Sequence, residues 1–208
     1  IPCGPHDQQS IDGRDDMVVF NVAAQDTELV LTGQMTAELY VSSDMIDTDF
    51  MVRISDVYND EAGTVRLLQD NAARMRWREK TQEPVYMTPA EVYKVEISLW
   101  NTSYVVAPGH SLRFVVQSSN FPRFSVNNNN GILLADPAYP GPVNVALNTV
   151  YHSAEYPSKL VLPVVVGGKA ALPEVDVVKE VQRKHPHLTK ELLGKFEKWI
   201  EKELSKKF

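Results

Sequence analysis

Apolar and polar residues alternate one by one along several short segments of this chain. The alternation runs through residues 34–41, 50–55, 93–99 and 112–117. Successive side chains of a β-strand point to opposite faces, so a period of two is typical of strands that bury one face. Turn-forming residues such as Pro108-Gly109 separate the segments. The sequence therefore predicts short strands joined by turns.

Two more strands are expected near residues 146–153 and 158–165. A series of short strands without a helical period between them is typical of antiparallel sandwiches and jelly rolls. We predict a mainly β fold, an antiparallel β-sandwich of the jelly-roll type, over residues 1–166. Pro163 has no N–H to donate and should lie at a sheet edge or a strand end.

The pattern changes after Val166. Residues 167–172 are predicted to be a linker, and residues 173–208 an amphipathic helical hairpin that forms a C-terminal tail. Thr189 can cap the second helix, whose apolar side chains recur at helical spacing. The candidate partner-binding residues on this stripe are Leu192, Leu193, Phe196, Trp199, Ile200 and Leu204.

An apolar helix face has to be covered by something. The favoured interpretation is that the stripe packs on its own β-domain or on the neighbouring helix. The alternative is that it docks a partner chain or a missing domain. Contact with a membrane surface ranks last, because Glu197, Glu201 and Glu203 dilute the positive face.

The formal net charge of −6 divides into −9 before Gly167 and +3 from Gly167 onward. Such a chain has no overall basic surface, which argues against nucleic acid as a partner. No apolar run approaches the roughly 20 residues of a membrane helix. The first residue is Ile1, which predicts that the chain was cut from something longer, and the single cysteine gives no indication of the compartment.

One segment imitates a catalytic motif. Gly109-His110-Ser111-Leu112-Arg113 begins like a G-x-S-x-G nucleophile elbow, but arginine replaces the last glycine. The elbow needs a strand, a sharp turn and a helix, whereas here a turn leads into a predicted strand. No catalytic triad can be assigned among the serines, aspartates and histidines, because triads are recognised by geometry. We therefore assign no catalytic residue.

Four aspartates lie between residues 44 and 56, namely Asp44, Asp47, Asp49 and Asp56. Spaced carboxylates of this kind could form a calcium site, because calcium prefers oxygen ligands. The order D-M-I-D-T-D lacks the glycine and the distal glutamate of an EF-hand. We expect these aspartates to start a strand by accepting hydrogen bonds from nearby backbone N–H groups. His185-Pro186-His187 is interpreted as a helix break. No metal site and no cofactor site is predicted.

Three arginines flank a tryptophan in the segment Arg74-Met75-Arg76-Trp77-Arg78. If this segment is a strand, the arginines share one face and Met75 and Trp77 share the other. A carbohydrate platform or a cation–π contact is one interpretation. The favoured one places Trp77 in the core and pairs the arginines with the acidic surface.

An ordered set of segments resembles the C-terminal β-domain of cocaine-esterase-like and X-Pro dipeptidyl-peptidase-like serine hydrolases. The segments that carry the resemblance, over about four-fifths of the chain, are Gly4-Pro5-His6-Asp7, Thr48-Asp49-Phe50, Arg74-Met75-Arg76, Leu99-Trp100-Asn101, Ser118-Ser119-Asn120-Phe121-Pro122-Arg123-Phe124, the run Asn127 to Asn130, and Tyr156 to Pro163. The resemblance implies a galactose-binding-like jelly roll without catalytic residues. The triad of such enzymes lies in a preceding α/β-hydrolase domain.

The function expected from this resemblance is that of a non-catalytic domain of a serine hydrolase of the dipeptidyl-peptidase or esterase type. Such a domain packs on a separate or missing α/β-hydrolase domain and shapes substrate access or assembly. One alternative is a structural subunit that keeps the fold and binds a complex through the tail. The other is a carbohydrate-binding module, since jelly rolls often serve as lectins.

Overall fold

The computed structural model describes residues 4–132 and 141–166 of the chain. These residues form antiparallel strands, with helical structure limited to two short 3-10 helices, Gln9–Ile11 and Met75–Trp77. The predicted mainly β fold is confirmed. The strands are β1 Met17–Asn21, β2 Leu29–Ser43, β3 Asp49–Val57, β4 Val65–Arg74, β5 Tyr93–Val106, β6 Ser111–Gln117, β7 Asn148–Tyr151 and β8 Lys159–Val161.

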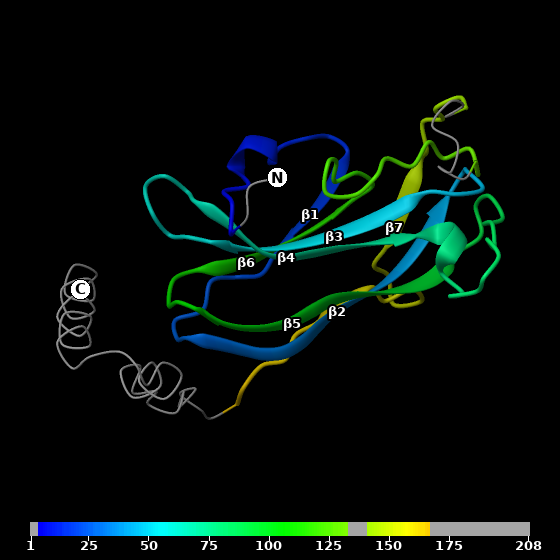
Figure 1. Ribbon diagram of the computed structural model, residues 1–208. Coiled ribbons are helices and arrows are strands. Elements are labelled where there is room, and N and C mark those ends of the chain that lie inside the picture. Colours follow the sequence, from blue (N-terminus) through cyan, green and yellow to red (C-terminus); the bar gives the residue numbers. More distant parts are fainter. Residues whose placement is uncertain (1–3, 133–140, 167–208) are drawn as a thin grey trace, which may run out of the picture. The chain divides into compact units, whose positions relative to one another are not determined.

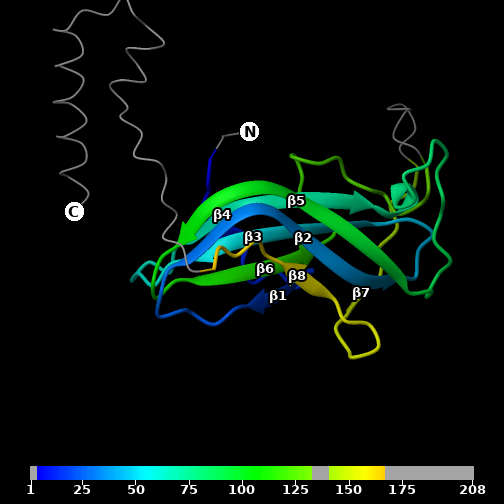
Figure 2. The same cartoon turned by 90° about the horizontal axis from the view of Figure 1, so that it is seen from below.

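The strands form two sheets (Figure 1). One has the order β1-β6-β3-β4, and the other has the order β5-β2-β7, with β8 also paired to β2. β2 is long enough to pair with β5 along one edge and with β7 and β8 in turn along the other. Figure 2 shows β2 and β5 running together across the domain.

The expected alternation is confirmed on β2 and β5. Met35, Ala37, Leu39 and Val41 are completely buried, while the residues between them are half-buried or exposed. β5 contributes Val95, Ile97 and Leu99 to the same core in the same way. Burial of such side chains is the main stabilising term, roughly 1.5–3 kcal/mol each.

The central strand β3 departs from the expected pattern, because it is buried on both faces. Arg53, predicted on a polar face, has a side chain only 3% exposed. Its guanidinium donates hydrogen bonds to Gln8 Oε1 at 3.1 Å and to Asp12 Oδ1 at 3.3 Å. The N-terminal segment, residues 4–16, therefore covers the outer face of this sheet. Burial lowers the pKa of Arg53, and the nearby Asp12 carboxylate opposes that shift.

The position of Pro163 agrees with its prediction. Pro163 follows the end of β8, where it accepts a hydrogen bond from the Thr32 N–H at 2.9 Å and packs against Gly33. Gly33 has a φ of 134°, and a Cβ there would lie 3.0 Å from the proline ring. Glycine at this position lets the end of the described chain lie close against β2.

The linker at 167–172 and the helical tail at 173–208 lie outside the described residues and stay predictions. Within residues 4–132 and 141–166, no helix is long and apolar enough to cross a membrane.

Candidate functional site

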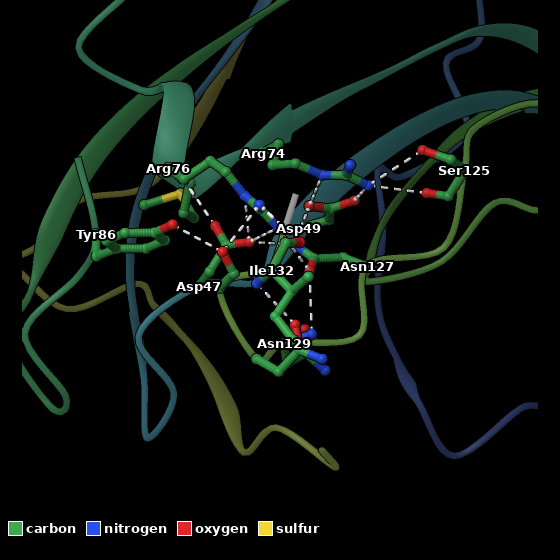
Figure 3. A network of polar contacts seen from close by, with 12 residues as sticks. Asp47, Asp49, Arg74, Arg76, Tyr86, Ser125, Asn127, Asn129 and Ile132 are labelled. Atoms are coloured by element: carbon green, nitrogen blue, oxygen red, sulfur yellow. Dashed lines mark hydrogen bonds and ion pairs between the residues drawn. The ribbon is translucent and has the colours of Figure 1, made fainter. Parts of the chain in front are cut away.

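The residues of most chemical interest lie at one end of the β-domain. Because the strands are antiparallel, β2 and β4 end there and β3 begins there. β6 also ends there and is followed by a long loop. We call residues 118–132 the asparagine loop. Buried charged groups hold this loop to the strands (Figure 3).

Asp47 and Arg76 form the centre of the arrangement. The Asp47 side chain is fully buried, and that of Arg76 is 2% exposed. Asp47 Oδ2 lies 2.6 Å from Arg76 Nη2 and 2.8 Å from its Nε, while Oδ1 accepts the backbone N–H of Arg76 at 2.9 Å. A buried pair of charges needs such complete hydrogen bonding to offset its desolvation.

Asp49 and Arg74 form a second pair beside the first. Arg74 donates from Nε to Asp49 Oδ1 at 2.9 Å and from Nη2 to Oδ2 at 2.8 Å, which is the bidentate geometry that arginine and carboxylate favour. Its hydrogen bonds to Asp49 raise the pKa of Arg74, while burial opposes the rise. Arg74 Nη2 also donates to the carbonyl of Ser125 at 2.9 Å. The pair therefore reaches the asparagine loop as well as β3 and β4.

Asn127 joins the two pairs. Its side-chain amide donates to Asp47 Oδ2 and to Asp49 Oδ1, both at 2.7 Å. Its carbonyl oxygen accepts the Asn129 N–H at 3.0 Å. We call Asp47, Asp49, Arg74, Arg76 and Asn127 the aspartate–arginine network.

The rest of the asparagine loop is fixed by carbonyl contacts. Arg76 Nη1 donates to the carbonyl of Ile132 at 3.0 Å, and the Tyr86 hydroxyl donates to that of Gly131 at 2.7 Å (Figure 3). The Asn129 side-chain amide donates to the Asn144 carbonyl at 2.8 Å. Arg76 therefore helps to hold a loop that lies more than fifty residues away in sequence.

The predicted arrangement of the arginine–tryptophan segment is wrong. β4 ends at Arg74 and the chain continues as a 3-10 helix, so residues two apart no longer share a face. The arginines do pair with acidic residues, but Arg76 is buried instead of lying at the surface. Trp77, expected in the core, is 37% exposed. The cation–π contact in this region is made by Arg78, whose Cζ lies 4.4 Å from the centre of the Tyr93 ring.

A strand does begin at these aspartates, since β3 starts at Asp49, but the predicted hydrogen-bond partners are wrong because the observed ones are distant in sequence. Asp47 and Asp49 bind the side chains of two arginines and an asparagine, and the one backbone N–H that Asp47 accepts belongs to Arg76, 29 residues away. Asp44 accepts the N–H of Leu147 at 2.8 Å. In the described part of the chain, no three histidine, cysteine, aspartate or glutamate residues are placed to hold a metal ion.

An apolar surface borders the network. Val18, Val126, Val145 and Leu147 are exposed to 44%, 44%, 90% and 73%, and all four line a hollow of about 430 Å³ between β1, the asparagine loop and the approach to β7. We call these four residues the valine–leucine surface. Asn127 and Asn129 also line the hollow. The buried charges therefore fix the loop that carries part of this exposed apolar surface.

The opposite end of the domain contains the apparent nucleophile elbow. Gly109 has a φ of 81° and forms a turn, and Ser111 begins β6, so the strand predicted after the turn is confirmed. His110 Nδ1 lies 3.1 Å from the Asp56 carboxylate, which also accepts the Tyr104 hydroxyl at 2.8 Å. In the described ranges, no serine hydroxyl is hydrogen-bonded to His110, so the arrangement is not that of a serine triad.

The candidate partner-binding residues fall outside the described residues, so the structure does not place them. They are Leu192, Leu193, Phe196, Trp199, Ile200 and Leu204. The network was not predicted from the sequence, although its segments carry the family resemblance separately. Three of the segments that carry the resemblance lie together in the structure. They are Thr48-Asp49-Phe50, Arg74-Met75-Arg76 and the asparagine run.

Several known proteins are similar to this chain. The cocaine esterase of Rhodococcus sp. (strain MB1 Bresler) is 36% identical over 162 residues, which cover 78% of this chain and 28% of that protein. A putative serine esterase of Mycobacterium tuberculosis (strain CDC 1551 / Oshkosh) is 24% identical over 166 residues, covering 72% of this chain and 24% of the relative.

Solved structures show the same likeness. An aminopeptidase from the marine sediment archaeon Thaumarchaeota archaeon matches with a TM-score of 0.73 and 28% identity, over 77% of this chain and 28% of that one. An α-amino acid ester hydrolase matches with a TM-score of 0.71 and 29% identity, over 77% of this chain and 27% of the hydrolase chain. The chain thus spans less than a third of the length of each of these relatives.

The family model of the X-Pro dipeptidyl-peptidase C-terminal non-catalytic domain matches residues 4–161. That range contains all eight strands and the whole aspartate–arginine network. The resemblance inferred from the sequence is confirmed, and the chain belongs to the family of X-Pro dipeptidyl-peptidase C-terminal non-catalytic domains.

Proposed function

We propose that this chain packs on an α/β-hydrolase domain and shapes its substrate access or its assembly, while the hydrolase domain performs the reaction on an ester or peptide. We infer that its two sheets form a jelly roll of the galactose-binding-like type. In support, the chain corresponds to 28% of the cocaine esterase that it resembles, and its family model describes a non-catalytic domain.

The valine–leucine surface is the observation that carries the proposal. Val145 and Leu147 are exposed to 90% and 73% beside a hollow. Exposed apolar side chains grouped around one hollow and rimmed by polar residues are typical of surfaces that another protein covers. A hydrolase region joined to the chain is the natural occupant, because more than two thirds of each relative's length lies outside the match.

The aspartate–arginine network fits this role because it makes the surface rigid. Loops usually lose conformational entropy when they bind, and a loop already held by buried hydrogen bonds loses less. Val126 lies one residue before Asn127, which bonds to both aspartates. The network thus contributes to binding through the position of the loop and takes no part in bond cleavage.

A domain exchange tests the proposal. This chain replaces the matching 162 residues of the Rhodococcus cocaine esterase, and ester hydrolysis and labelling by a serine-reactive fluorophosphonate are measured. We expect the fusion to be active and labelled, and the isolated 208-residue chain to be neither. Labelling of a serine within the isolated chain would refute the proposal.

Two charge substitutions test the surface itself. Val145→Asp with Leu147→Asp should reduce activity of the fusion at least tenfold and expose the hydrolase region to protease, because two charges would be buried at the contact. Val105→Asp is the matched control, since Val105 is 45% exposed at the opposite end of the domain. Equal activity of the double variant and the control would rule out this contact.

A second candidate function rests on the apolar stripe of the predicted tail. Under it the chain is a structural subunit, and the side chains from Leu192 to Leu204 bind another subunit of a complex. Deletion of residues 167–208 should then release the β-domain from that complex on size-exclusion chromatography. Full retention of the shortened chain would contradict this function.

A further inference from the structure

A second hollow lies on the side of the β-domain, between the edge strands of the two sheets. It has a volume of about 500 Å³ and is formed by the end of β4, the residues that follow it and the start of β5. Ala72 and Ala73 leave it open on the β4 side because their side chains are small. Neither sheet has a further strand beyond β4 or β5 in the described residues to fill it.

Trp77 gives this hollow an apolar face. Its side chain is 37% exposed, although the indole ring is among the largest apolar groups a protein can bury. The 3-10 helix that follows β4 places Met75 and Arg76 inside and leaves Trp77 at the hollow. An exposed indole beside polar groups is suited to a ligand that has both an apolar face and polar edges.

Arg78 provides a fixed polar group next to Trp77. Its side chain is only 8% exposed, and its Nη1 donates to the carbonyls of Met75 at 3.0 Å and Val85 at 2.5 Å. Its Nε is buried and makes no hydrogen bond, although Glu79 Oε1 lies 3.3 Å away. The Arg78 guanidinium therefore gives the hollow a fixed, positively charged wall beside Trp77, while its own hydrogen bonds stay within the protein.

The charges that line the hollow are balanced. Arg74 is paired with Asp49, and Lys94 lies 2.8 Å from the Glu38 carboxylate. The charged residues that then remain on the lining are two cations, Arg78 and Lys80, and two anions, Glu79 and Glu96. A charged ligand would gain little from such a surface, whereas a neutral ligand with many hydroxyl groups would find both donors and acceptors.

We propose that the hollow beside Trp77 binds a neutral saccharide, with the apolar face of one sugar ring on the indole and its hydroxyl groups on Glu79, Lys80 and Glu96. The volume accommodates a ligand of one to a few rings, since ligand pockets span roughly 300–1,000 Å³. The site goes beyond the proposed docking role and uses none of the residues of the valine–leucine surface.

The test is calorimetric titration of the purified 208-residue chain with four neutral hexasaccharides, namely maltohexaose, cellohexaose, xylohexaose and mannohexaose. We expect at least one to bind with a Kd of about 1 mM or tighter. Trp77→Ala should weaken that binding at least about tenfold, as loss of a stacked ring does elsewhere, and Trp77→Phe should retain most of it.

Trp100→Ala is the matched control, because Trp100 is 60% exposed on β5 and does not line the hollow. It should leave the affinity unchanged. Absence of binding to all four sugars, binding that survives Trp77→Ala, or binding of an acidic hexagalacturonate alone would each overturn the proposal. These outcomes are independent of the domain exchange, because that experiment measures ester hydrolysis and labelling and not saccharide binding.

Discussion

Asp47 and Arg76 are 29 positions apart in sequence, yet Asp47 Oδ2 lies 2.6 Å from Arg76 Nη2 and neither side chain is more than 2% exposed. Asp47 precedes β3, and Arg76 follows β4. Because Arg76 also reaches the carbonyl of Ile132, this pair fixes three connecting segments to one another. Paired charges, rather than apolar contacts alone, hold the end of the domain together.

Replacement of Asp47 by alanine should lower the free energy of unfolding by about 3–5 kcal/mol, because it leaves the buried Arg76 guanidinium without its carboxylate. Urea denaturation of the purified chain measures this loss. Asp44→Ala is the control, since Asp44 is exposed and accepts the N–H of Leu147 at 2.8 Å. A loss at position 47 no larger than at position 44 would contradict the importance of the buried pair.

Asn127→Ala should cost about 2 kcal/mol, because two carboxylate oxygens each lose a buried hydrogen bond. The larger effect should be local. Amide hydrogen exchange of residues 125–132 should become faster than in the parent, while exchange in β2 changes only with global stability. Asn101→Ala, at an exposed position on β5, serves as the comparison. Uniform exchange across the domain would argue against a role of Asn127 in fixing the loop.

Two glycine substitutions separate backbone strain from crowding. Gly131 and Gly13 have φ values of 76° and 87°, so alanine at either position costs roughly 1 kcal/mol. A Cβ at Gly131 would also lie 2.9 Å from Ile46 Cδ1 and 3.1 Å from Tyr86 Cε1, whereas none of these close contacts exists at Gly13. Gly131→Ala should therefore be the less stable variant on thermal unfolding. Equal melting temperatures would show that the Gly131 site relaxes freely.

The stability of the domain should fall in alkaline solution through Tyr104. Burial and the hydrogen bond to Asp56 raise the pKa of the Tyr104 hydroxyl above its usual value. The unfolded chain therefore loses this proton first, so the stabilisation is complete below the ordinary tyrosine pKa of about 10 and is lost as the pH rises above it.

Urea denaturation of the parent and of Tyr104→Phe between pH 8 and pH 11 checks this expectation. The parent should be more stable at pH 8, because phenylalanine leaves one Asp56 oxygen without the hydroxyl donor at 2.8 Å. The difference should shrink as the pH rises. Parallel curves over the whole range would contradict the assignment to Tyr104.

The parts of the fold that follow from local pattern were predictable. On β2 and β5, alternation alone identified the core residues from Met35 to Val41 and from Val95 to Leu99. On β3 it failed, because Arg53 is covered by Gln8 and Asp12, which are some forty residues away. A period of two shows which residues share a face of a strand, but it does not show which segment later covers that face.

The candidate site was predictable only in pieces. The sequence drew attention to Asp47, Arg76 and Asn127 separately, yet nothing local indicates that they meet. The alternation assumed for the arginine segment ended at Arg74, because a 3-10 helix with a period of three replaced the strand. Because of this change of period, Arg76 is buried where exposure was expected, and Trp77 is partly exposed where burial was expected.

The cover over Arg53 has a practical consequence for dividing longer relatives into domains. A fragment that starts at β1 would lose Gln8 and Asp12, expose the outer face of the sheet around β3 and remove the two side-chain oxygens that accept hydrogen bonds from Arg53. Polypeptides cut there should misfold or aggregate even though every strand is present. A cloning boundary for this domain is better placed upstream of His6, whose carbonyl accepts the N–H of Leu67 at 3.2 Å.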